Sequence, residues 1–136
     1  MGLTQVMAQE VLLTIHPTTG TKTLGTKTIT APIVLRLMTA NGSATANGTE
    51  LASGGSYVAG TGLSIGANWA APSGTSQSSN AAVSQANMPA ATTVGVELWD
   101  SSGTPQRIEH GSMTSKTTQA GDTLTFTSGA ITSAFA

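Results

Sequence analysis

The chain has 136 residues, a formal net charge of −1 and no cysteine, and only 8% of its residues are charged. This composition excludes a disulfide framework, a thiolate zinc site and a cysteine nucleophile, and it argues against a nucleic-acid partner, whose phosphates are bound mainly by Lys and Arg. Thr, Ala, Gly and Ser fill more than half of the positions, so a single domain of this length has a thin hydrophobic core and would gain from burying surface against a partner.

Residues 3–16 form the segment with helical periodicity, and Pro17 ends it because the residue before a proline avoids the helical region. The apolar residues that recur at spacings of three and four, and would share one stripe, are Leu3, Val6, Met7, Val11 and Ile15. A helix of about 14 residues is marginal alone in water. We therefore expect residues 1–17 to form an N-terminal helical arm that packs either on its own domain or on a neighbouring subunit.

After Gly20 the hydrophobic period changes to two, which is typical of strands with one face on a core. The segments expected to contain strands are 21–30, 33–38, 57–69 (as one long strand or two short ones), 80–86, 94–99, 107–113, 123–127 and 130–135. The segments 39–56 and 70–79 are rich in small and polar residues, so we expect exposed loops there, with a short edge strand near Glu50.

Short strands joined by turn residues, with no crossover helix after His16, predict an all-β fold. We expect an antiparallel β-sandwich of about eight strands in a jelly-roll-like arrangement, preceded by one short N-terminal helix. The sandwich would occupy residues 18–136 as a single domain, and the sequence spacing leaves its strand order open.

The few titratable residues give little support for the clustered groups that catalysis needs. His16 lies at the end of the predicted helix, and on a strand Glu109 and His110 would point to opposite faces. Asp100 and Asp122 lie in turn sequences, where an Asp side chain commonly bonds the following backbone. These positions predict structural roles, so we expect no enzymatic activity, no metal and no cofactor.

The two tryptophans allow two interpretations. An exposed aromatic platform could stack on sugars, whereas in a chain with few large side chains the rings more often fill a core or a subunit interface. Trp99 follows the alternating residues 94–98, so we expect it to face a second buried surface, which a neighbouring subunit could provide. The candidate docking residues are Leu3, Val6, Met7, Val11, Trp69 and Trp99.

The order of strand and turn residues is most distinctive in the C-terminal half. Residues 88–105 read MPAATTVGVELWDSSGTP, residues 111–126 read GSMTSKTTQAGDTLTF, and upstream LRLMTANG at 35–42 is followed by GTE at 48–50 and GGSY at 54–57. This succession resembles a family of small virion proteins of tailed bacteriophages, commonly labelled tail-fibre or head-decoration proteins, over most of residues 3–135. The chain departs from that pattern at Asn41, where an acidic-proline turn is usual, and at His110, where an aromatic is common.

The resemblance implies a structural virion component without catalysis, assembled in the cytoplasm of a bacterial host and located on the capsid surface. As a capsid decoration or cement protein, the chain would associate with copies of itself, as a homotrimer, and bridge subunits of the major capsid protein. The alternative is a tail-fibre or tail-appendage module that binds host surface glycans through exposed aromatics. A membrane partner is not expected, because no apolar run approaches the roughly 20 residues of a membrane span.

Overall fold

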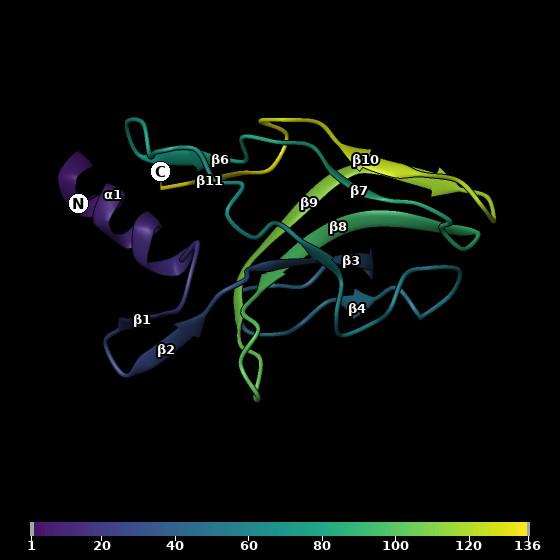
Figure 1. Cartoon of the computed structure of the whole chain (residues 1–136), viewed down its shortest axis with the longest axis horizontal. Helices are drawn as coiled ribbons and strands as arrows, with labels where there is room; N and C mark the ends of the chain where they lie inside the picture. The colour runs from purple at the N-terminus through teal and green to yellow at the C-terminus, as the bar shows by residue number, and fades with distance from the viewer. Residues whose placement is uncertain (1, 136) are drawn as a thin grey trace.

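The computed structural model describes residues 2–135, which contain one helix and eleven strands (Figure 1). The helix is α1 (Gln5–Ile15). The strands are β1 (Thr21–Leu24), β2 (Lys27–Thr30), β3 (Val34–Ala40), β4 (Thr49–Glu50), β5 (Leu63–Ser64), β6 (Ser76–Ser78), β7 (Val83–Gln85), β8 (Ala91–Trp99), β9 (Arg107–Thr118), β10 (Leu124–Phe126) and β11 (Thr132–Ala134). The protein is therefore mostly β with one short N-terminal helix, as the sequence predicts.

All of the sheets are antiparallel, and none of them closes into a barrel. The largest has the order β4-β3-β8-β9, and β5 also pairs with β3. Three two-stranded sheets accompany it, formed by β1 with β2, by β7 with β10, and by β6 with β11. In sequence, the β6–β11 pair encloses the β7–β10 pair, which encloses the β8–β9 hairpin. The strands from β6 to β11 therefore form three nested pairs.

One hydrophobic core joins the helix, β2, the five-stranded sheet and the small sheet formed by β7 and β10. Ile33, Leu35 and Leu37 are fully buried, as the alternation predicts, but Val34 and Met38 on the opposite face are buried as well, so β3 is covered on both faces. The remaining buried members include Leu12 and Ile15 from α1, Leu98 from β8, Val83 from β7 and Leu124 from β10. The core is continuous although Leu, Ile, Val and Phe are scarce in the chain.

The predicted helix is confirmed, with bounds one or two residues inside those expected. The Thr4 hydroxyl accepts a hydrogen bond from the Met7 amide (3.4 Å), which satisfies one free N–H of the first turn. Pro17 follows the C-cap His16 and stops the helix. In Figure 1 α1 lies at one end of the molecule, where it contacts β1 and β6. No helix among residues 2–135 has the length and apolar character needed to cross a membrane.

The structure differs from the sequence prediction mainly in segments that were expected to be loops or long strands. Residues 57–69 contain just the two-residue strand β5, and residues 70–79, expected as a loop, contain β6. Residues 39–56 are not wholly exposed, because Leu51 is buried beneath the sheet edge formed by β4. These short strands raise the total above the expected eight, since two or three residues are too few to show a hydrophobic period.

Residues 41–48 cover part of the outer face of the five-stranded sheet, opposite the core. Gly95 lies in the middle of β8 beneath this segment, and a Cβ there would overlap the Asn41 side chain and lie 2.8 Å from the Gly111 carbonyl oxygen. Glycine at this position therefore permits the close approach of the segment to the sheet.

We predict that Gly95→Ala lowers the free energy of unfolding by about 1–3 kcal/mol, because the added methyl group overpacks this contact. The matched control is Gly103→Ala, where nothing lies within 4 Å of an added Cβ. That variant should stay within about 0.5 kcal/mol of the wild type in urea denaturation. Equal stability of the two variants would contradict the close packing over β8.

Candidate docking surface

Four apolar side chains of the N-terminal arm face solvent. Leu3, Val6, Met7 and Leu13 are 50%, 69%, 53% and 46% exposed, and we call this set the α1 stripe. The opposite side of the helix carries Ala8, Leu12 and Ile15, which are buried in the domain. The arm therefore packs on its own domain and still presents a second apolar face. Val11, predicted with the docking residues, lies between the two faces and packs partly against the core.

The tryptophans are covered by their own chain. Trp69 is 6% exposed and its ring stacks on His16 with 4.0 Å between centroids and 12° between planes, which removes it from the candidate docking surface. Trp99 is half-buried, with the Arg36 guanidinium carbon 4.1 Å from its ring centroid. Trp99 thus packs against Arg36 of its own chain, and its contact with a neighbouring subunit stays a prediction.

A buried polar cluster around His16 holds the end of α1. The imidazole is fully buried, its Nδ1 lies 2.8 Å from Gln77 Oε1, and its Nε2 lies 3.3 Å from Glu109 Oε2. The Gln77 amide nitrogen donates to the Ala70 carbonyl (2.9 Å), which fixes its oxygen toward the ring. Both ring nitrogens therefore face acceptors, and both can donate when the ring is an imidazolium. The Ser133 hydroxyl donates to the other carboxylate oxygen of Glu109.

This cluster contains Ser, His and Glu, but its order differs from that of a nucleophilic triad. In a triad the imidazole accepts the proton of the serine hydroxyl and the carboxylate orients the imidazole. Here Ser133 donates to Glu109, and the two ring nitrogens of His16 are directed to Gln77 and Glu109. The arrangement can tie α1 to β6, β9 and β11, and its imidazole is not directed at the hydroxyl.

Glu109 gives this tie a pH dependence. Burial alone would raise the pKa of its carboxyl, but hydrogen bonds from His16 and Ser133, with the charge of His16, bring the net pKa below its ordinary value. A carboxyl whose pKa is lower in the folded chain stabilises the fold fully above its unfolded pKa. That stabilisation is lost as the pH falls through the lowered pKa that Glu109 has in the folded chain.

We predict that the free energy of unfolding decreases with acidification through the carboxyl range, and that Glu109→Gln reduces this decrease. Urea denaturation from neutral pH to pH 3 would measure both slopes. Glu10→Gln is the matched control, because Glu10 is exposed and its carboxylate makes no bond with residues 2–135. A slope that Glu109→Gln and Glu10→Gln change equally would contradict the role of the cluster.

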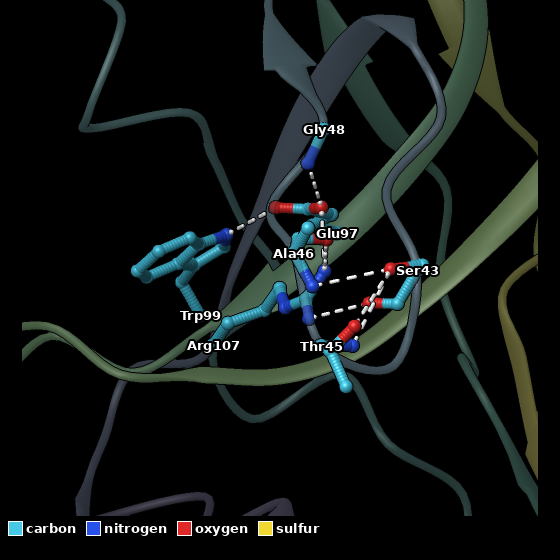
Figure 2. Close-up of polar contacts among 7 residues, drawn as sticks. All are labelled: Ser43, Thr45, Ala46, Gly48, Glu97, Trp99 and Arg107. Carbon is cyan, nitrogen blue, oxygen red and sulfur yellow. Dashed lines mark hydrogen bonds and ion pairs between the residues drawn. The ribbon is translucent and has the colours of Figure 1, made fainter.

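A second buried cluster fastens residues 43–48 over the sheet (Figure 2). The Glu97 side chain is 1% exposed and accepts hydrogen bonds from the Gly48 amide (2.7 Å), the Trp99 indole (3.1 Å) and Arg107 (3.0 Å). Arg107 also donates to the carbonyl oxygens of Ala46 and Ser43, at 2.8 and 2.6 Å. One ion pair thus satisfies a buried carboxylate and holds a loop that has few apolar side chains of its own.

Glu50 and Tyr57 extend this polar layer at the other side of β3. The Tyr57 hydroxyl donates to Glu50 (2.9 Å) and accepts from the Leu37 amide (3.0 Å), while Arg36 lies 3.8 Å from Glu50. Burial is the main cause that raises the pKa of Tyr57 well above its ordinary value. The phenol therefore stays protonated and keeps its donor bond at all ordinary pH values.

We predict that Arg107→Ala lowers the free energy of unfolding by about 3–5 kcal/mol, because it leaves the Glu97 charge buried without its partner. Residues 43–47 should then become sensitive to a nonspecific protease. Lys116→Ala on the same strand is the control, since Lys116 is exposed, and its effect should stay within about 0.5 kcal/mol. Adding Glu97→Gln to Arg107→Ala should recover part of the loss, and failure to do so would contradict this account.

The remaining candidates from the sequence lie where turns or the surface place them. Asp100 is buried and accepts bonds from the amides of Thr30 (3.0 Å) and Gln106 (2.7 Å), and Asp122 accepts from the Gln119 amide (2.8 Å). His110 is exposed, on the other face of β9 from Glu109. No group of three or more His, Cys, Asp or Glu in the described residues could hold a metal ion.

Sequence reasoning missed the cluster around His16. Gln77 and Glu109 are 61 and 93 residues from His16 along the chain, so no local spacing joins them to it. A comparison of the chain with protein-family models, curated proteins and solved structures finds no match. The geometry of the α1 stripe and of the covered tryptophans therefore carries the functional argument.

Proposed function

We propose that the protein is a structural component of a tailed-bacteriophage virion that decorates or cements the capsid. The observation that carries the proposal is the α1 stripe, an exposed apolar face on a helix whose opposite face is anchored in the domain. Apolar side chains gathered on one exposed face mark an interaction surface. A chain with few charges and a thin core is then stabilised by assembly with further copies and with the major capsid protein.

The order of strands and turns in residues 88–126 supports the same proposal, through its resemblance to small virion proteins. The nested pairing of β6 with β11, β7 with β10 and β8 with β9 supports a jelly-roll-like sandwich, in which a folded antiparallel ribbon produces such nesting. A compact β body that carries an apolar arm suits a subunit of a capsid surface layer. Its contribution there is contact area, and no reactive group takes part.

The state of the aromatic side chains favours this role over a tail module that binds host glycans. Glycan recognition uses exposed aromatic faces, whereas Tyr57 and Trp69 are buried and Arg36 lies over the ring of Trp99. The Arg36 guanidinium occupies one face of the Trp99 ring and so reduces the area on which a sugar could stack. We therefore propose the capsid surface as the location, after assembly in the cytoplasm of a bacterial host.

We predict hundreds of copies per particle when virions that contain this protein are analysed by quantitative mass spectrometry against their major capsid protein. The purified chain should also rebind to capsids stripped of it, and it should give no signal on a glycan array. A few to a dozen copies per virion, or binding to a defined glycan, would overturn the proposal and place the chain in the tail.

A further inference from the structure

The buried imidazole of His16 is directed at two hydrogen-bond acceptors. Its side chain has no exposed surface, and its two nitrogens lie 2.8 Å from Gln77 Oε1 and 3.3 Å from Glu109 Oε2. The Gln77 oxygen stays toward the ring because the amide nitrogen donates to the Ala70 carbonyl. The Glu109 carboxylate can only accept, since its lowered pKa keeps it ionised at neutral pH. A neutral imidazole has one N–H, so one of these two acceptors would then face a nitrogen lone pair.

The ring of Trp69 supports the charged form of the imidazole independently. It stacks on the His16 ring with 4.0 Å between centroids and 12° between planes. A cation over the face of an indole is attracted by the negative charge of that face. The imidazole thus meets one carboxylate, one amide oxygen and one aromatic face, and each of them favours a protonated ring.

The elements packed around the ring supply charges of both signs. Glu109 of β9 is the acidic group that faces the ring, whereas β6 and β11 carry uncharged side chains. Lys22 of β1 lines the same hollow as His16, and its ammonium opposes a second positive charge there. Glu10 of α1 and His110 of β9 are exposed, and the strand register places His110 on the face of β9 opposite Glu109. The close carboxylate therefore acts on the ring against a single, exposed ammonium.

We propose that His16 is held in the folded chain as an imidazolium and that loss of its proton loosens α1 from the domain, so that the attachment of the arm responds to pH. A neutral ring would regain two partners if the Gln77 amide turned over, but the bond to the Ala70 carbonyl would then be lost. Either outcome costs the cluster one hydrogen bond. Residues 18–20 are exposed and join α1 to β1, so the arm can move once its attachment weakens. This inference goes beyond the proposed function and does not depend on it.

Nitrogen-15 NMR of the full chain measures the protonation state of the ring directly. At pH 7 both ring nitrogens of His16 should have the chemical shifts of protonated nitrogens, and one of them should lose that shift on titration toward pH 9. His110, which is exposed, gives a reference titration in the same spectra. A single protonated nitrogen on His16 at pH 7 would overturn the proposal.

Amide hydrogen exchange measures the attachment of the arm. From pH 6 to pH 9 the protection of α1 amides should fall about tenfold relative to the amides of β8, because one proton separates the attached from the loosened arm. His16→Gln should remove this pH response, since an amide does not titrate in this range, whereas the matched control His110→Gln should keep it. Glu109→Gln should move the response to lower pH, because the ring proton then has no carboxylate partner.

The comparison with β8 separates a loosened arm from a general loss of stability. Protection of α1 that changes in parallel with that of β8 at every pH would overturn the inference, and so would a pH response that survives His16→Gln. The ring nitrogens are measured on the unaltered chain, so the proposal stays testable even if the substitution at His16 prevents folding.

Discussion

The direction of the N-terminal helix depends on the hydrogen bonds of one buried imidazole. His16 ends α1, and its ring joins Gln77 of β6, Glu109 of β9 and the face of Trp69. A buried ring of this kind costs free energy unless its polar atoms find partners, and here each nitrogen has one within 3.3 Å. Because these partners come from three separate segments, the helix end can adopt one position on the body. That position sets where the α1 stripe points.

On the outer face of the five-stranded sheet, a different pair of buried polar residues also finds bonding partners. Glu97 and Arg107 are nearly buried, and together they bind the backbone of residues 43–48. Replacing such a pair with hydrocarbon is often neutral or stabilising, whereas removing one partner is costly. The pair therefore fixes the conformation of residues 43–48 more than it stabilises the folded chain. The domain places its large apolar side chains in one thin core and covers its second face with polar bonds.

The sequence predicted the elements in which apolar residues recur at a regular spacing. The helix, β3 and β8 were identified because their apolar residues repeat over several turns or pleats. β5 and β6 were missed because strands of two or three residues have no period, and their pairing is decided by distant partners. The docking residues of α1 were predicted from one stripe, but Ala8, Leu12 and Ile15 have the same spacing and form the buried face. A helix that is apolar on two sides offers no local signal for which side turns inward.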